Sequence, residues 1–125
     1  MRAAFEGEHF SFPVAENTGI STLFIEDVID SIVDFAAAEK DRLTRHVYNL
    51  HAFYLTAGMV AVAAREYFPE FKYDFAPVES VDHLISSWPD APDDSDARRD
   101  WGWQPKYDFD KTMTRIVELL NAARD

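Results

Sequence analysis

Cysteine is absent from this chain of 125 residues, and glycine is scarce. Without a thiol, disulfide frameworks, thiolate zinc sites and cysteine nucleophiles are all excluded. The four glycines are Gly7, Gly19, Gly58 and Gly102. They lie too far apart to form a glycine-rich dinucleotide-binding turn or a phosphate-binding P-loop. We therefore expect this chain to bind no nucleotide cofactor by itself.

The sequence also has few positively charged residues and no long apolar run. Lys and Arg number 12 against 23 Asp and Glu, which gives a formal net charge of -11. This charge repels phosphate backbones and anionic lipid surfaces on average. No apolar stretch approaches the roughly 20 residues that span a bilayer, and residues 1–8 lack the apolar segment of a signal peptide. We expect a cytoplasmic protein with neither a nucleic-acid nor a membrane partner.

The chain does have enough apolar material for a core. Hydrophobic residues make up 47% of it and aromatic residues 14%. Such a composition offsets the entropy lost on ordering and separates the chain from disordered acidic tails. A chain of this length buries roughly two-thirds of the surface that its unfolded form exposes, and it corresponds to one ordinary domain. We predict a single domain over residues 1–125.

Several stretches have the residue content or the alternation of β-strands. Residues 9–14 predict a short edge strand, because Pro13 cannot donate a hydrogen bond to a ladder. Residues 20–25 can extend, and residues 45–50 have the β-branched and aromatic content of a strand. Residues 71–75 alternate apolar and polar side chains, which is typical of a half-buried strand.

Helical spacing of apolar residues recurs between these stretches. A helix is predicted over residues 26–39, where Glu26 and Asp27 favour the positive end of its dipole. Thr56 is placed to cap a second helix, which Pro69 ends. The residues of that helix predicted to face the core are Met59, Val60, Ala63, Ala64 and Tyr67.

Two further helices are predicted near the carboxyl end. Asp93 or Asp94 caps a short helix that runs through Asp100, and a final amphipathic helix begins at Asp108 or Asp110. Strand-like and helix-like stretches therefore alternate through most of the sequence. The fold class predicted from this order is α/β, with mixed α+β character.

The histidines show no sign of a metal centre. His9, His46, His51 and His83 lack the i, i+4 spacing with an intervening glutamate that is typical of a helical zinc site. No nucleophile elbow surrounds any serine either. We predict surface or structural roles for the histidines and no metal site.

Tyr107 and Lys111 have the tyrosine-x-x-x-lysine spacing of a catalytic pair on one helix face. Such a pair needs both residues inside one helix and a cofactor beside them, whereas Tyr107 precedes the expected cap of the last helix. We therefore predict a packed aromatic residue and a solvated lysine. The sequence offers no catalytic residue.

Acidic and aromatic residues gather between positions 88 and 103. The acidic cluster lacks the glycine and the twelfth-position glutamate of an EF-hand loop, so capping and solvation explain it better than calcium. Trp101 and Trp103 are expected to pack in the interior. Trp88 precedes Pro89 in an expected loop, where it either packs or buries the face of a small ligand. The acidic residues are Asp90, Asp93, Asp94, Asp96 and Asp100.

Residues 87–103 read SWPDAPDDSDARRDWGW and are followed by Tyr107-Asp108-Phe109. This run resembles the closing segment of L-threonine 3-dehydrogenases of the short-chain type. Its later elements fit many nucleotide-sugar epimerases of the extended class, and the Ser-Trp-Pro motif with the paired aspartates narrows the resemblance to the threonine enzymes. Upstream, residues 24–28 and 47–50 are similar to segments that those enzymes carry in the same order.

The resemblance implies an NAD-dependent extended short-chain dehydrogenase of the epimerase/dehydratase family, which oxidises the threonine 3-hydroxyl to 2-amino-3-oxobutanoate. It implies that this chain is the small C-terminal lobe that binds an amino-acid substrate. The Rossmann core that holds NAD and the catalytic tyrosine and lysine would then lie outside the chain, which would be inactive alone. Trp88 is the substrate-binding residue that the motif carries over, as a side chain that lines or closes the pocket. Residues 51–54 and 75–83 depart from the usual pattern, so the exact substrate stays open.

Other functions and partners remain open at this point. The chain could be a free-standing binding or interaction module, or the substrate lobe of a nucleotide-sugar epimerase. The net negative charge modestly disfavours the epimerase lobe, because its substrate carries a diphosphate. The resemblance also implies that the helix over 26–39 and the strand at Val47 pack on a nucleotide-binding domain. We expect that domain, self-association or a rearranged edge strand to cover this apolar surface.

Overall fold

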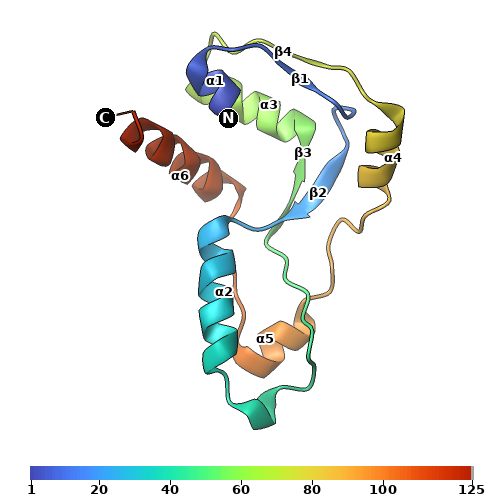
Figure 1. Ribbon diagram of the computed structural model, residues 1–125, viewed down its shortest axis with the longest axis vertical. Coiled ribbons are helices and arrows are strands. Elements are labelled where there is room, and N and C mark those ends of the chain that lie inside the picture. The colour runs from blue at the N-terminus through green and yellow to red at the C-terminus, as the bar shows by residue number, and fades with distance from the viewer. Residues whose placement is uncertain (125) are drawn as a thin grey trace.

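Two short β-ladders organise the structure, a computed structural model that describes residues 1–124 (Figure 1). β1 (Phe10–Phe12) pairs in parallel with β4 (Tyr73–Phe75), and β2 (Gly19–Thr22) pairs antiparallel with β3 (Phe53–Thr56). Neither ladder has a third strand among the described residues. The strands predicted over 9–14 and 71–75 are therefore confirmed in shortened form.

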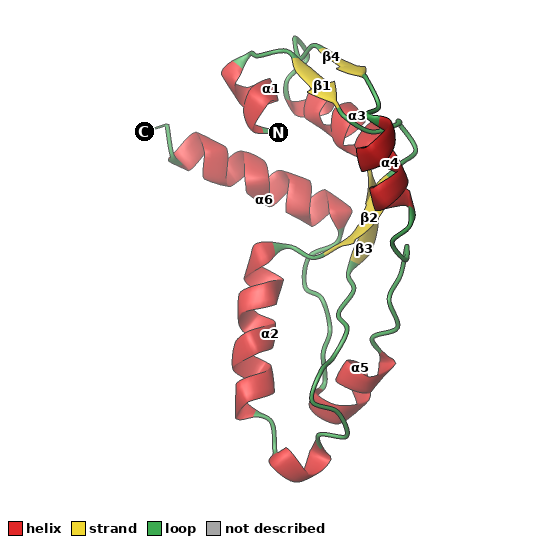
Figure 2. Cartoon of the chain, turned by 45° about the vertical axis from the view of Figure 1, so that its right-hand side comes forward, coloured by secondary structure: helices red, strands yellow, loops and turns green. Residues whose placement is uncertain are grey.

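Helices make up most of the remaining regular structure (Figure 2). The predicted mixed α/β fold class is confirmed by this combination of helices with short sheets. The helix predicted over 26–39 is present and ends slightly earlier. The helices are α1 (Arg2–Glu6), α2 (Ile25–Ala37), α3 (Ala57–Tyr67), α4 (Glu79–Ser86), α5 (Ser95–Trp101) and α6 (Phe109–Ala122), with a short 3-10 turn at Lys40–Arg42.

The molecule is elongated, and its two ends differ in how they are held together. α1, α3, α6 and the β1–β4 pair form the upper end in Figure 1, whereas α2 and α5 form the lower end. The two buried apolar clusters belong to the upper end, because their members come from α1, β1, α3 and the segment before β4. These clusters consist of Ala4, Ala64 and Phe71, and of Phe12, Ala57 and Ala61.

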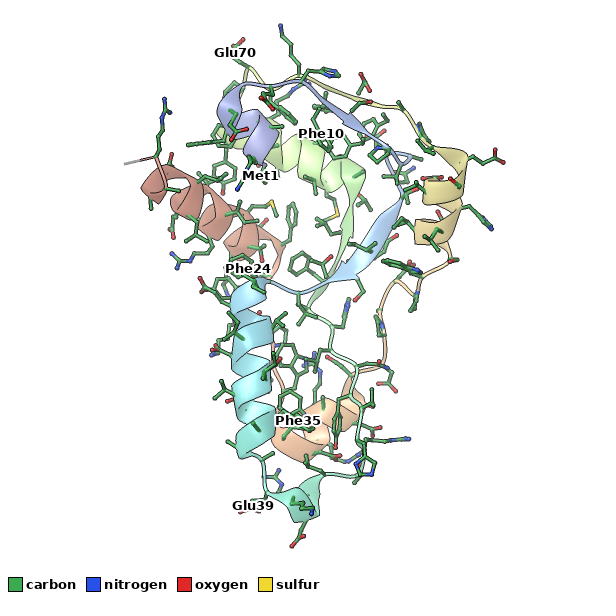
Figure 3. The ribbon with its side chains drawn as sticks, viewed as in Figure 1. Met1, Phe10, Phe24, Phe35, Glu39 and Glu70 are labelled. Atoms are coloured by element: carbon green, nitrogen blue, oxygen red, sulfur yellow. The ribbon has the colours of Figure 1, made fainter. Side chains whose placement is uncertain are left out.

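An aromatic group and the carboxylate of Asp100 hold the lower end. Phe35 of α2 lies edge-on to Tyr48, with ring centroids 5.5 Å apart, and its ring is 5.9 Å from that of Trp101 on α5. Figure 3 shows Phe35 on the side of α2 that faces α5. The buried carboxylate of Asp100 accepts hydrogen bonds from the Thr44 amide at 2.9 Å and from the Tyr48 hydroxyl at 2.7 Å.

Polar side chains begin the helices where the sequence predicts them. Thr56 caps α3 by accepting a hydrogen bond from the Met59 amide at 3.1 Å. Asp108 caps α6 by accepting from the Lys111 amide at 2.9 Å. Each cap satisfies one of the amides that a helix start leaves without a partner. The predicted cap at Thr56 is therefore confirmed, and of the two caps predicted for the last helix the structure uses Asp108.

The strand predicted over residues 45–50 is wrong. These residues belong to no strand, and the nearest strand begins only at Phe53. A strand requires a neighbouring strand to complete its hydrogen bonds, and none lies beside this segment within residues 1–124. Instead, Tyr48 at its centre reaches Asp100. Residues 20–25 are also only partly extended, because β2 ends at Thr22 and α2 begins at Ile25.

The predicted inward face of α3 is only partly correct. Ala63 and Ala64 are buried, but Met59 is 37% exposed and Tyr67 is 39% exposed. The Tyr67 hydroxyl shares a hydrogen bond with Thr114 on α6 at 2.9 Å. Small residues bring this helix close to the β1–β4 pair, so the larger side chains are left at its margins.

Candidate functional site

Trp88 lies in residues 87–94, the connection between α4 and α5. Its amide donates to the Ile85 carbonyl at 3.1 Å, and the Ser87 hydroxyl donates to the Leu84 carbonyl at 2.7 Å. These bonds fix the backbone of Trp88 against the end of α4. The Trp88 side chain is nevertheless 49% exposed. An anchored backbone with an accessible indole is suited to contacting a ligand.

The far end of this connection is anchored by Asp94. Its carboxylate accepts hydrogen bonds from the buried Trp103 indole at 3.0 Å and from Arg98, with both Arg98 contacts at 2.8 Å. The Arg98 hydrogen bonds are the main reason that the pKa of Asp94 lies below its ordinary value. The neighbouring Asp93 accepts a hydrogen bond at 3.0 Å from the amide of Ser95, the first residue of α5. The predicted packing role of Trp103 is confirmed.

Tyr54 of β3 approaches the connection from the β2–β3 ladder. Its ring lies so close to Gly19 that a Cβ added there would be 2.8 Å from the ring and 2.6 Å from the Leu55 carbonyl. Glycine is therefore required at position 19 by close packing. Burial, and then the charge of Asp90 and a hydrogen bond with it, raise the pKa of Tyr54. Asp90 in the connection is thus near enough for its charge to act on the Tyr54 hydroxyl.

His51 completes the polar surroundings of the ladder. Its Nδ1 shares a hydrogen bond of 2.7 Å with the hydroxyl of Ser21, which is opposite Tyr54 in the β2–β3 register. Both His51 and Ser21 are half-buried. His51 therefore has a structural partner, as predicted for the histidines.

Most of the predicted acidic cluster has structural partners. Asp93 and Asp94 are engaged at the start of α5. Asp96 forms ion pairs with Arg45 and Arg99, both at 2.8 Å. Thr44, Tyr48 and Arg99 surround Asp100, and the Thr44 hydroxyl is the main reason that its pKa lies far below the ordinary range. Within residues 1–124, no group of three or more acidic or histidine side chains is arranged to hold a metal ion.

Tyr107 and Lys111 are not arranged as a catalytic pair. Tyr107 lies before α6 and donates its hydroxyl hydrogen bond to Glu26, which raises the pKa of Tyr107. A tyrosine that acts as a base requires the opposite shift. The ammonium of Lys111 lies 3.6 Å from Asp108. The structure therefore favours the packed-aromatic interpretation of Tyr107.

The start of α3 does not fit the pyrophosphate of a dinucleotide. β3 runs directly into α3, as in a nucleotide-binding strand-turn-helix unit, and Gly58 lies at the helix start. However, the Ala57 amide donates to the Thr18 carbonyl at 3.0 Å and the Gly58 amide to the Glu16 carbonyl at 2.8 Å. The Met59 amide donates a hydrogen bond to the Thr56 hydroxyl. Because these amides already have acceptors, the helix start cannot receive a pyrophosphate.

The sequence did not single out Tyr54, and it placed Asp90 only in the acidic cluster that capping and solvation explain. Residues 51–54 were marked only as a departure from the related pattern. The alternation of side chains along β3 indicates that Tyr54 and Phe53 face opposite sides of the strand, but it does not show which loop each side contacts.

Every helix within residues 1–124 is too short or too polar to cross a bilayer.

Comparison with curated proteins first defines the class. The chain matches no family model. It is 38% identical over 120 residues to an uncharacterized epimerase/dehydratase of Staphylococcus saprophyticus, a match that covers 94% of this chain and 36% of the relative. An uncharacterized epimerase/dehydratase of Staphylococcus aureus is 37% identical with the same coverage. The chain is thus similar to epimerase/dehydratases over nearly all its length, and it spans about a third of theirs.

Comparison with solved structures shows a similarity to a more specific group of proteins. A GalE-like L-threonine dehydrogenase from Cupriavidus necator superposes with a TM-score of 0.88 at 29% identity, covering 95% of this chain and 43% of that one. A partial consensus L-threonine 3-dehydrogenase gives a TM-score of 0.90 at 30% identity, covering 97% of this chain and 39% of that one. The fold matches a C-terminal portion of GalE-like dehydrogenases. The resemblance drawn from residues 87–103 is confirmed.

Proposed function

We propose that this chain is the substrate-binding portion of an NAD-dependent oxidoreductase that acts on a small amino acid such as L-threonine. The observation that carries the proposal is the superposition of 95% of the chain on an L-threonine dehydrogenase, combined with the exposed Trp88 in the shared motif. Trp88 supplies an apolar face for the substrate, held in place by the anchors at Ser87 and Asp94. The exact substrate is set by contacts that the rest of the enzyme completes.

In this proposal a second body supplies the catalytic groups, since we find neither a dinucleotide site nor a catalytic pair within residues 1–124. One face of α2 supports docking of such a body. Its exposed side chains recur at positions i, i+4, i+7 and i+8, which is the spacing of a helix face that packs against a partner. A continuous apolar stripe of this kind marks an interaction surface. The residues are Ile25, Ile29, Ile32 and Val33, with exposures of 58%, 54%, 63% and 61%.

The segment over residues 46–50 supports docking at the same end of the molecule. None of its backbone amides donates to another residue within the described chain, and Val47 is 82% exposed. A backbone without partners accepts an added strand readily. Beside it, a hollow of about 170 Å³ is lined by Ile32, Phe35 and Trp101, among others. We infer that the nucleotide-binding domain adds a strand along 46–50 and covers α2, which explains why these residues have strand content without forming a strand.

Calorimetric titration of the purified chain with L-threonine, and separately with NAD, tests this function. We expect weak heat from threonine, none from NAD, and loss of the threonine signal in Trp88→Ala. Leu119→Ala, which removes a comparably exposed apolar side chain from α6, serves as the matched control and should bind as the wild type does. Binding of NAD would contradict the absence of a cofactor site. If neither ligand binds, a non-catalytic interaction module becomes the better description.

A further inference from the structure

Asp90 differs from the other aspartates of its cluster in having neither an ion pair nor a hydrogen bond from a backbone amide within residues 1–124. No Lys, Arg or His side chain forms an ion pair with it within residues 1–124, and it is exposed. The other aspartates of the cluster all have partners within the chain. Asp93 accepts from an amide at the start of α5, and Asp94 pairs with Arg98. Asp96 pairs with Arg45 and Arg99, and Asp100 accepts from Thr44 and Tyr48. Asp90 therefore keeps its charge available to something outside the chain.

The position of Asp90 places this charge at the proposed substrate site. Asp90 follows Trp88 by two residues, so their Cα atoms lie within about 7 Å of each other. Pro89 between them has a fixed φ, which limits how far the turn can rearrange. The Tyr54 ring is packed against Gly19, and Asp90 is near enough for its charge to act on the Tyr54 hydroxyl. An exposed indole and an exposed carboxylate thus lie close together in the connection between α4 and α5.

This combination of groups has a clear chemical preference. The face of an indole attracts a cation through its quadrupole, and a carboxylate forms charge-assisted hydrogen bonds with an ammonium group. A carboxylate ligand or a phosphate would be repelled by Asp90 and by the net charge of -11. The surface is therefore suited to an ammonium group rather than to the acidic end of a substrate.

We infer that Asp90, oriented by Tyr54, is a specificity-determining residue that binds the ammonium group of an amino-acid substrate lying against Trp88. This inference rests on the proposed function, because it names the contact that distinguishes an amino acid from other hydroxylated acids at the same site. The carboxylate of the substrate then points away from Asp90, toward the body that completes the enzyme. Asp90 acts in recognition only and takes no part in moving the hydride or the proton.

Calorimetric titrations with a matched pair of ligands test the inference. The pair is L-threonine and 3-hydroxybutanoate, which keeps the hydroxyl and the carboxylate but has no ammonium group. We expect Asp90→Asn, which preserves shape and removes the charge, to weaken threonine binding roughly tenfold. The same variant should leave 3-hydroxybutanoate unchanged or slightly improved. Asp110→Asn, at another exposed aspartate, is the charge-matched control and should bind both ligands as the wild type does.

Tyr54→Phe provides a second variant for the orienting contact. It retains the ring against Gly19 and removes only the hydroxyl, so we expect a smaller loss of threonine affinity than in Asp90→Asn. Threonine binding that depends on Trp88 but is unchanged in Asp90→Asn would overturn the role of Asp90 and leave the proposed function intact. Equal losses for both ligands in Asp90→Asn would also overturn it, because that result indicates a structural effect. Failure of the wild-type chain to bind threonine would overturn both.

Discussion

The buried carboxylate of Asp27 at the start of α2 accepts a hydrogen bond from the backbone amide of Tyr107 at 3.1 Å. The same carboxylate accepts a second bond from the Lys106 amide at 3.0 Å. Two positions far apart in the sequence are thereby joined where α2, β2 and the start of α6 meet (Figure 1). This carboxylate therefore holds the start of α2 against residues 106–107.

Asp27→Ala should therefore destabilise the chain more than other acidic substitutions on α2. Two part-buried amides would lose their acceptor, and we expect the free energy of unfolding in urea to fall by roughly 3 kcal/mol. Asp30→Ala is the control, since Asp30 pairs with Lys106 in an exposed ion pair. Its loss should cost less than about 1 kcal/mol. Equal effects of the two substitutions would show that Asp27 does not anchor residues 106–107.

Asp100 should make the stability of the chain sensitive to acid. Hydrogen bonds from Thr44 above all hold its folded pKa far below the ordinary value. A lowered folded pKa means that its contribution is fully present above the unfolded pKa, which is about 3.9, and is lost as the pH falls from there toward the folded value. Urea unfolding of Asp100→Asn should show lower stability at pH 7 and a weaker further loss below about pH 4 than the wild type. Parallel curves for the two proteins below that pH would contradict this role.

The cap of α3 predicts a graded effect at Thr56. Thr56→Ala removes the acceptor of the Met59 amide, and we expect a loss of about 1 kcal/mol in the free energy of unfolding. Thr56→Ser keeps the hydroxyl and should recover most of this loss. The comparison by thermal or urea unfolding separates capping from the contribution of Thr56 to β3. If serine is no better than alanine, the side-chain methyl rather than the cap is responsible.

The apolar stripe on α2 predicts that the isolated chain self-associates. Light scattering after size-exclusion chromatography should show particles larger than a monomer at high concentration, because an exposed stripe of this size favours contact with another copy. Ile29→Glu should shift the distribution toward the monomer. Leu84→Glu on α4 introduces the same charge at a comparably exposed position, 55% against 54%, and should have little effect. A strictly monomeric wild-type chain at high concentration would contradict this prediction.

The sequence predicts helix starts and short strands well, because these local features depend on neighbouring residues. Thr56 and Asp108 start helices through bonds to amides three residues on, and the alternation over residues 71–75 gives β4. The motif over residues 87–103 also identifies the related class, since such a run reflects shared ancestry. These features need no knowledge of where distant segments lie.

Other features depend on the tertiary structure. Residues 45–50 have the content of a strand, yet strand formation requires a neighbour that the described chain does not provide. The spacing of Tyr107 and Lys111 fits a catalytic pair, and only the position of Glu26 shows that the hydroxyl is already engaged. Trp88 is visible in the sequence, whereas the approach of Tyr54 to Asp90 is decided by how β3 lies relative to the α4–α5 connection. Local pattern thus determined the elements and the class, while long-range contacts, which no spacing along the chain encodes, decided which side chains meet at the site.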